Sequence, residues 1–197
     1  ITSGYYLSHL VKTHPGLWER FQVKPSPYEN VKLLINKLST YEMARSIGIN
    51  VLKSILLSDI DINRIEFPAI AKWNEDIHFF MKPDFKTAII ENGQQLKEFA
   101  SKYSEKEKRH IALQRYLGDD LNDNISYGAY YYRGNCLAGI LVQQKRQYPL
   151  GLSSYVREYK GTESEILIQK AQRLFTQMDY TGFGEAEFKY DRKTEQF

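Results

Sequence analysis

The sequence contains a single cysteine and few histidines, which excludes several kinds of site. Cys136 cannot form a disulfide within the chain, and a metal site built from several thiolates is ruled out. Cys136 lies in the apolar run 136–142, which is typical of a buried structural thiol rather than a nucleophile. The four histidines are scattered and show no paired spacing of the kind that binds a metal ion.

The sequence also lacks a long apolar stretch and an N-terminal secretory signal. No run of residues approaches the length that a membrane-spanning helix requires. Internal repeats and low-complexity linkers are absent as well. We therefore expect a cytoplasmic protein that has no membrane partner.

Neither sign of charge dominates the chain. It carries 27 basic and 24 acidic residues, and the formal net charge of +3 is spread along the sequence. This balance suits a small anionic ligand as easily as a nucleic acid. No contiguous basic stripe or base-stacking motif is present, so we expect no nucleic-acid partner. The 197 residues, 42% hydrophobic, are typical of a globular chain with one substantial core or two small subdomains, and they do not indicate an oligomeric state.

Turn signals and hydrophobic patterns predict the elements of the first half of the chain. Residues 1–30 are expected to form a short helix, a turn and a loop. Ser39 and Glu42 have the spacing of a capping box, and Gly48 supplies a stop, so a helix is predicted over 40–47. The other predicted elements of this half are strands at 51–57, 67–72 and 87–90 and a helix at 94–103.

The second half is dominated by strands. Two long strands, 126–132 and 136–146, are joined by the hairpin turn Arg133-Gly134-Asn135. The other predicted elements are a strand at 111–117, a helix at 163–178, a strand at 184–190, a turn at 191–194 and the start of a further strand. This order favours an α+β fold with antiparallel sheets over a doubly wound parallel sheet.

A lysine, Lys72, ends the short apolar strand predicted at 67–72. Its aliphatic stem can pack while its ammonium group points into a cleft, and burial of that charge without a partner would be costly. A phosphate group is a suitable counter-ion. The alternative is a lysine that extends from the strand end into solvent, and Lys72 alone does not decide between them.

A second lysine, Lys37, follows Asn36 directly before the predicted helix. A lysine at this place can meet an anion beside the helix N-terminus, where backbone N–H groups attract negative charge. Most lysines near helix starts are solvated, so Lys37 alone is a weak indication of a site.

Two carboxylates, Glu185 and Glu187, alternate along the last predicted strand and therefore share one face. Two carboxylates side by side are unfavourable unless a cation lies near one of them. A magnesium ion would satisfy this condition, and so would Lys189, which is expected on the same face. Both interpretations stay open at this point.

Polar side chains crowd the end of the second hairpin strand. Alternation sends Gln143, Lys145 and Gln147 to one face, and Gln144 and Arg146 to the other. One face could hydrogen-bond a ribose, a phosphate or a substrate carboxylate. The alternative is an exposed polar strand end.

The order of these features resembles the ATP-grasp superfamily of carboxylate–amine and carboxylate–thiol ligases. The series is a lysine before a helix, a lysine ending a strand, the strand Gln114-Arg115-Tyr116-Leu117-Gly118, a basic strand end and an acidic residue on a late strand. The sequence is most similar to the uncharacterised carboligase branch and, more distantly, to the nucleotide-binding half of biotin carboxylase, over about 32–197. The resemblance implies two lobes with antiparallel sheets and flanking helices that clamp a nucleotide.

The resemblance implies that Lys37 and Lys72 bind the ATP phosphates. It also implies that a hinge between the lobes, made of Gln114, Arg115, Tyr116 and Leu117, holds adenine through backbone groups. These residues are expected to form the centre of the nucleotide site.

Further roles are implied at the edges of the site. Asp120, or its neighbour Asp119, would meet the ribose, and Gln143 is placed with the nucleotide-binding residues. Glu187 would be the first magnesium carboxylate. Arg146 lies in the basic substrate-side segment and is the candidate catalytic residue.

The resemblance divides the chain into an N-terminal helix and loop left from a preceding domain (1–30), a small lobe (31–107) and a larger lobe (108–197). Two departures from the family pattern stand out. The segment 73–86 has no glycine where a glycine-rich loop often closes over the phosphates, so closure would depend on side chains such as Lys82. The family's Glu-x-Asn strand and following arginine would fall beyond Phe197, so the larger lobe is expected to be incomplete at its C-terminus.

The ligands implied are ATP, Mg²⁺ and a small-molecule carboxylate, joined to an amine or thiol through an acyl phosphate. Because Glu187 alone would hold magnesium weakly, we expect this chain by itself to be inactive. Two alternatives remain. A catalytically inactive nucleotide-binding module is favoured by the glycine-free segment, and a domain that binds no nucleotide is the other. The carboxylate and the nucleophile are not identified by the sequence.

Overall fold

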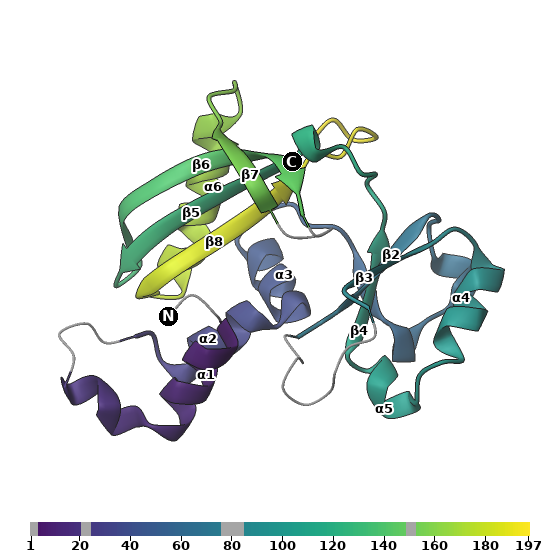
Figure 1. The fold of residues 1–197 in the computed structure, drawn as a ribbon, viewed down its shortest axis with the longest axis horizontal. Helices are drawn as coiled ribbons and strands as arrows, with labels where there is room; N and C mark the ends of the chain where they lie inside the picture. Colours follow the sequence, from purple (N-terminus) through teal and green to yellow (C-terminus); the bar gives the residue numbers. More distant parts are fainter. Residues whose placement is uncertain (1–3, 21–24, 76–84, 149–152) are drawn as a thin grey trace.

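The computed structural model describes residues 4–20, 25–75, 85–148 and 153–197. Their strands form two four-stranded sheets in which every pair of neighbours is antiparallel, with the orders β1-β4-β2-β3 and β7-β6-β5-β8. Helices flank both sheets (Figure 1). The predicted α+β fold with antiparallel sheets is confirmed.

Short strands and helices make up the first half of the chain, and longer strands dominate the second. The strands are β1 (Ser54–Leu56), β2 (Ala69–Trp73), β3 (Thr87–Ile90), β4 (Ile111–Arg115), β5 (Asn124–Tyr132), β6 (Asn135–Gln147), β7 (Ser153–Glu158) and β8 (Gly182–Lys189). The helices are α1 (Gly4–Thr13), α2 (Tyr28–Ile35), α3 (Lys37–Ser46), α4 (Gly93–Ala100), α5 (Glu105–Lys108) and α6 (Ser164–Gln177), with short 3-10 turns that include η4 (Leu121–Asp123).

The first sheet buries one face and leaves the other partly open. In β2, Ala69, Ala71 and Trp73 are buried, whereas Ile70 and Lys72 lie on the opposite, more accessible face. Ala71 and Trp73 join a core that α4 covers, and β3 pairs with β2. Lys72 therefore projects from the face of the sheet that α4 does not cover, as period-two alternation requires.

The second sheet packs one face against α6. In β5, Ile125, Tyr127, Ala129 and Tyr131 alternate along the strand and are all buried in one core with α6. The β5–β6 hairpin turns at Arg133 and Gly134, whose φ angles of 50° and 72° are those of a tight primed turn. The predicted hairpin and the predicted C-terminal helix are thus present.

Helix α3 lies between the two sheets (Figure 1). Its residues Met43, Ala44 and Ile47 belong to the core of the second sheet. The two sheets divide between Arg115 and Asn124, because β4 pairs with β1 and β2. This division lies several residues beyond the lobe boundary that we expected at 107/108, where β4 would have been cut from its sheet.

Several local predictions need correction. Helix α3 begins at Lys37, and its N-cap is Asn36, whose side chain accepts the Ser39 N–H. The predicted Ser39–Glu42 capping box is wrong, because Ser39 already lies inside the helix. A true capping box joins Ser104 to Glu107 at α5, a helix that we did not predict. Strand β7 was also missed, because its six residues are all exposed and show no alternation. Strand β1 is shorter than expected and covers only Ser54–Leu56.

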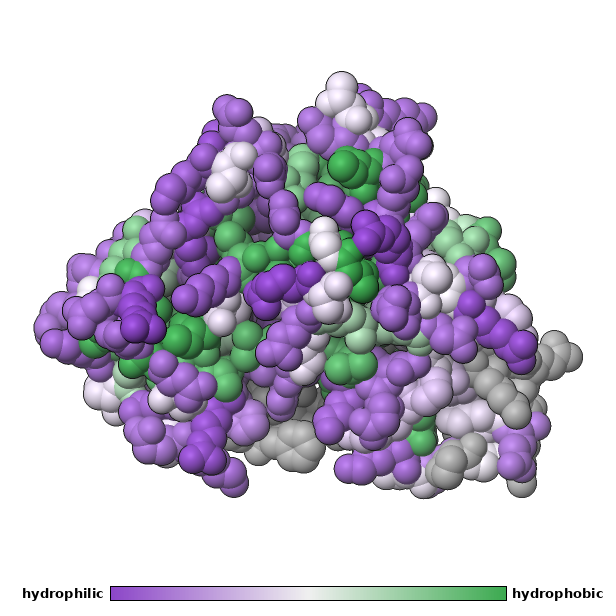
Figure 2. All heavy atoms as spheres, turned by 180° about the vertical axis from the view of Figure 1, so that it is seen from behind, coloured by the Kyte–Doolittle hydropathy of each residue, from purple (hydrophilic) through white to green (hydrophobic). Residues whose placement is uncertain are grey.

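The surface of the molecule is mixed in character. Seen from behind, a mostly hydrophilic surface surrounds a band of apolar side chains across the middle (Figure 2). Among the described residues, none of the helices has the length and apolar character needed to cross a bilayer.

The core of the second sheet contains a polar group that has no hydrogen-bond partner in the described part of the chain. Tyr131 is fully buried, its ring stacks on Phe175 with centroids 4.5 Å apart, and its hydroxyl has no hydrogen bond within the described ranges. The neighbouring Tyr180 is equally buried, but its hydroxyl donates to the carbonyl of Phe183 at 2.9 Å.

Replacing Tyr131 by phenylalanine is expected to stabilise the protein by about 1 kcal/mol, because a buried hydroxyl without a partner is unfavourable. The matched variant Tyr180→Phe is expected to lower stability by a similar amount, because it removes the hydrogen bond to the Phe183 carbonyl. Urea unfolding of both variants measures the difference. A Tyr131→Phe variant that is less stable than the wild type would contradict this account of the core.

Candidate functional site

A cleft of about 2120 Å³ lies between the two sheets. Both sheets, α3 and the segment after β4 contribute to its walls. The cleft brings together most of the residues that the sequence singled out: Lys37, Lys72, Gln114, Arg115, Tyr116, Leu117, Arg146 and Glu187. These residues lie up to 150 positions apart in the chain (Lys37 to Glu187), so the fold gathers them.

Lys72 and Glu187 both line this cleft. Within the described part of the chain, neither the Lys72 ammonium nor the Glu187 carboxylate makes a hydrogen bond or an ion pair. Loss of water in the cleft lowers the pKa of Lys72; Glu187 opposes this effect and Lys189 adds to it. An ammonium group in such a position is stabilised by a ligand of opposite charge.

Glu187 is surrounded by cations. Desolvation and the neighbouring Glu185 raise the pKa of Glu187, while Lys72, Lys86 and Lys37 act in the opposite direction. Glu187 comes from β8, Lys72 from β2, Lys37 from α3 and Lys86 from the segment before β3. The cleft therefore concentrates positive charge from three separate parts of the fold around one carboxylate.

Three of the cleft residues were not singled out as nucleotide-binding residues in the sequence. Lys86 is the last residue of the glycine-free segment, and its charge acts on Glu187. Lys189 continues the Glu185–Glu187 face, where it was expected, and donates to Asn124 Oδ1 at 3.0 Å. Tyr41 lies one helical turn after Lys37 on α3, and the i, i+4 spacing of these two cleft residues is the signal that could have identified it.

The N-terminus of α3 is not open to an anion through its backbone. The Lys37 and Leu38 N–H groups donate to the backbone and side-chain oxygens of Asn74, both at 2.9 Å, and the Ser39 N–H donates to Asn36 Oδ1. The expectation that helix N–H groups would attract an anion beside Lys37 is therefore wrong, because protein acceptors already occupy them. The Lys37 ammonium lies nearby and donates to the Trp73 carbonyl at 2.7 Å.

The segment at the end of β4 joins the two sheets. The Gln114 side chain donates to Ser54 Oγ at 2.7 Å and also hydrogen-bonds to Tyr41. The Arg115 guanidinium pairs with Asp191, directly beyond β8, so its side chain is engaged in a link between the sheets.

The next residues of this segment present backbone groups to the cleft. The Tyr116 N–H donates to the Pro68 carbonyl at 2.8 Å. Among the described residues, the Leu117 N–H has no hydrogen-bond partner. A ligand in the cleft could use this donor.

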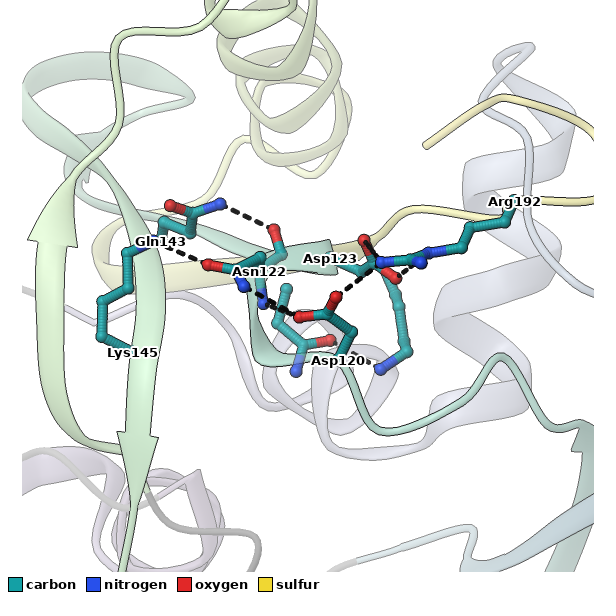
Figure 3. A network of polar contacts seen from close by, with 8 residues as sticks. Asp120, Asn122, Asp123, Gln143, Lys145 and Arg192 are labelled. Carbon is teal, nitrogen blue, oxygen red and sulfur yellow. Dashed lines mark hydrogen bonds and ion pairs between the residues drawn. The ribbon is translucent and has the colours of Figure 1, made fainter.

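Asp120 and Gln143 do not line the cleft. Both are bound to Asn122 in a polar network around η4 (Figure 3). Asp120 accepts the Asn122 N–H at 2.9 Å, and Gln143 donates to the Asn122 carbonyl at 2.7 Å. Hydrogen bonds from the Asn122 N–H and from the Asn122 side-chain amide, followed by that of Arg192, lower the pKa of Asp120. The neighbouring residues Asp119 and Gln144 line the cleft instead.

The basic end of β6 departs from simple alternation. Gln143 and Lys145 both reach Asn122, which agrees with the predicted shared face. Gln147 instead donates to Gln144 at 2.9 Å, because the pairing with β7 shifts register on both sides of Arg146. The exposed Arg146 lines the cleft and donates to Ser154 Oγ at 3.1 Å.

The carboxylates of β8 could hold a metal ion only together with other ligands. Glu185 and Glu187 are both exposed on one face, as predicted. In the described ranges, no group of three or more histidine, cysteine or acidic side chains could by itself hold a metal ion. This arrangement fits Mg²⁺, which usually takes one or two carboxylates and completes its shell with water and phosphate oxygens.

Two of the sequence features fall outside the described residues. Lys82 and most of the glycine-free segment lie in 76–84, and Pro149 of the basic segment lies in 149–152.

Comparison with known proteins gives matches among solved structures only: no protein-family model and no curated protein matches the sequence. L-amino acid ligase from Bacillus licheniformis matches with a TM-score of 0.67 and 12% identity over 97% of this chain and 44% of that enzyme. N5-carboxyaminoimidazole synthetase from Staphylococcus aureus matches with a TM-score of 0.67 and 18% identity over 94% of this chain and 48% of that enzyme.

A third match is D-alanine–D-alanine ligase from Bacillus anthracis in complex with ATP. It has a TM-score of 0.61 and 13% identity over 89% of this chain and 57% of that enzyme. The chain thus spans about half the length of these enzymes. At such identities the similarity concerns the fold, and all three are ATP-grasp enzymes. The chain therefore has the ATP-grasp fold.

Proposed function

We propose that this chain is the ATP-binding part of an ATP-dependent ligase that joins a carboxylate to an amine or a thiol. The observation that carries the proposal is the group of lysines around Glu187, in which the desolvated Lys72 has no partner among the described residues. Triphosphate oxygens would supply the missing negative charge. The fold supports the same function, because the structural neighbours include ligases that act on amino acids.

The nucleotide would lie along the cleft with its base at the segment after β4. The Leu117 N–H, which has no partner among the described residues, would hydrogen-bond the adenine edge, beside the Tyr116 N–H that Pro68 already occupies. Because Asp119 lines the cleft and Asp120 does not, Asp119 is the better ribose ligand. Lys37, Lys72 and Lys86 would then face the phosphates.

The metal would bind between the phosphates and β8. Glu187, with Glu185 beside it, would hold Mg²⁺ together with phosphate oxygens. When bound, the ion neutralises charge on the phosphates and holds them in line for transfer. The lysines act on the same charge from the opposite sheet, so the cleft as a whole would stabilise the transferring phosphoryl group.

The reaction would proceed in two steps. A substrate carboxylate oxygen attacks the γ-phosphorus, the bond to the β-phosphate oxygen breaks, and ADP leaves with an acyl phosphate formed. The nitrogen of an amine or the sulfur of a thiol then attacks the acyl carbon, the bond from that carbon to the phosphate oxygen breaks, and inorganic phosphate leaves. The nucleophile loses a proton to solvent as the amide or thioester forms. Arg146, exposed in the cleft, is the candidate to bind and orient the substrate carboxylate.

Calorimetric titration with ATP, with and without magnesium, tests the proposal. Saturable ATP binding that magnesium tightens is the expected result. Glu187→Gln is expected to reduce the gain in ATP affinity that magnesium provides by roughly 10- to 100-fold, the range for loss of a group that supports a metal site. The magnesium effect should also fade as pH drops through the raised pKa of Glu187, because the ion binds the ionised carboxylate.

The matched control is Glu98→Gln, an exposed glutamate on α4 outside the cleft lining. It should leave ATP binding and its magnesium dependence unchanged. Absence of ATP binding by the wild-type chain would remove the support for a nucleotide site. Equal losses in Glu187→Gln and Glu98→Gln would exclude Glu187 as the metal ligand.

A further inference from the structure

The N-terminus of α3 is bound to the end of β2 through Asn74. The Asn74 carbonyl accepts the Lys37 N–H, and Asn74 Oδ1 accepts the Leu38 N–H, both at 2.9 Å. A single residue directly after β2 thus binds two successive donors of the helix. The contact joins segments 36 positions apart in the chain.

Asn74 is itself held firmly in place. It is only 4% exposed, and its N–H donates to the His110 carbonyl at 2.7 Å, beside the start of β4. The adjacent Glu75 adds a second link to the helix, because its Oε1 accepts the Asn36 side-chain amide at 2.8 Å. Asn74 is therefore fixed to the first sheet, and the first turn of α3 is fixed to the same sheet through Asn74.

This link bears directly on the two lysines of the cleft. Lys72 lies two residues before Asn74 on β2, and Lys37 is the first residue of α3. The rest of α3 packs elsewhere: Met43, Ala44 and Ile47 belong to the core of the second sheet. The Asn74 contact thus ties the first turn of α3, which carries Lys37, to the strand that carries Lys72.

We propose that Asn74 is a positioning residue that fixes the distance between the Lys37 and Lys72 ammonium groups, and so matches the pair to neighbouring phosphates of one nucleotide. This inference rests on the proposed ATP site. A phosphate chain needs its cations at set positions, and small displacements of a binding group cause large losses. The hydrogen bond from the Lys37 ammonium to the Trp73 carbonyl, next to Asn74, completes the arrangement at 2.7 Å.

The test compares two asparagines whose side-chain oxygens accept N–H groups of a helix N-terminus. Asn74→Ala removes the acceptor of the Leu38 N–H, and Asn92→Ala removes the acceptor of the Gln94 and Gln95 N–H groups at α4, away from the cleft. Both variants are expected to melt at a lower temperature than the wild type. Only Asn74→Ala is expected to weaken ATP binding, by about tenfold.

Binding of adenosine separates positioning from a general loss of structure, because adenosine occupies the base site and lacks phosphates. We expect the adenosine affinity of Asn74→Ala to stay within about twofold of the wild type, well below the tenfold step that 1.4 kcal/mol represents. Should the alanine variant not fold, Asn74→Ser keeps a polar group at the buried position but is too short for the Leu38 N–H, and the same comparison applies.

The possible outcomes are distinct. Wild-type ATP binding that Asn74→Ala leaves unchanged, or weakens no more than Asn92→Ala does, overturns the positioning role and leaves the proposed function standing. Equal losses of ATP and adenosine affinity overturn it as well, because they indicate a purely structural role. If the wild-type chain binds adenosine as tightly as it binds ATP, both the proposed function and the inference are overturned.

Discussion

Replacing Lys72 by methionine is expected to weaken ATP binding by at least about tenfold, because charge-assisted hydrogen bonds contribute about 1.5–3 kcal/mol each. The same change is expected to raise the melting temperature of the free protein. Methionine keeps an unbranched apolar stem of similar length in the cleft and removes only the ammonium group. A residue that binds phosphate at the cost of stability is typical of a functional site.

The stability effect follows from the pKa of Lys72, which desolvation lowers below its value in the unfolded chain; Glu187 opposes this shift and Lys189 adds to it. Between the lowered pKa and the ordinary lysine pKa, the unfolded state binds more protons, so stability rises with pH in that window. At neutral pH, below the window, the unfavourable contribution of the charged side chain is fully present. Methionine removes it.

Calorimetry with ATP and thermal unfolding measure the two effects. Each gain of 1 kcal/mol corresponds to a rise of about 2–4 °C in a chain of this size. The matched control is Lys97→Met on the exposed face of α4, which should change neither quantity. Unchanged ATP affinity in Lys72→Met, or a lower melting temperature, would show that Lys72 is an ordinary strand-end lysine.

Proton uptake provides a second readout on the same residue. Phosphate binding favours charged Lys72 and therefore raises its pKa, so ATP affinity should decline as pH rises through the lowered pKa of the free protein. This decline should be absent from Lys72→Met.

The sequence predicted those parts of the fold that local patterns control. The β5–β6 hairpin was identified because Arg133-Gly134-Asn135 supplies the left-handed residues that a primed turn needs. Alternation along β8 correctly placed Glu185 and Glu187 on one face. Strand β7 could not be identified in the same way, since an edge strand exposed at every position has no periodic signal.

The position of α3 shows where local signals mislead. Ser39 and Glu42 have the spacing of a capping box, but Asn36 caps the helix. The helix begins there because the next two N–H groups find acceptors on Asn74, directly after β2. A contact between residues 36 positions apart leaves no trace in a sequence window. The start of the helix was therefore set by tertiary contacts.

The candidate site was partly predictable for a related reason. Lys72 and Glu187 stood out because a charge at the end of an apolar strand, or two carboxylates on one face, needs an explanation. Lys86 carries no such signal, since it ends a mixed polar and aromatic segment and not an apolar strand. Asp120 and Gln143 match the motif but point to Asn122, and only the geometry of η4 distinguishes them from Asp119 and Gln144.

Replacing Asp191 by asparagine is expected to destabilise the protein by about 2–3 kcal/mol, because it leaves the Arg115 guanidinium without its main buried partner. The two side chains are 10% and 18% exposed, and their pair links the end of β4 to the end of β8. A loss of this size lowers the melting temperature by several degrees. Because the link joins the two sheets beside the cleft, ATP affinity should fall as well.

The matched control uses the other partner of the same arginine. Glu66 lies 3.6 Å from Arg115 and is 53% exposed, so Glu66→Gln should cost less than about 1 kcal/mol.

Burial alone would raise the pKa of Asp191, but hydrogen bonds from Arg115, the Lys193 N–H and Thr194 lower it. A lowered carboxyl pKa contributes stability above the unfolded pKa that is lost as pH falls through the folded pKa. The difference in the free energy of unfolding between wild type and Asp191→Asn, measured in urea, should therefore be largest near neutral pH and shrink in acid. A difference that does not depend on pH would show that the charge of Asp191 does not hold Arg115 in place.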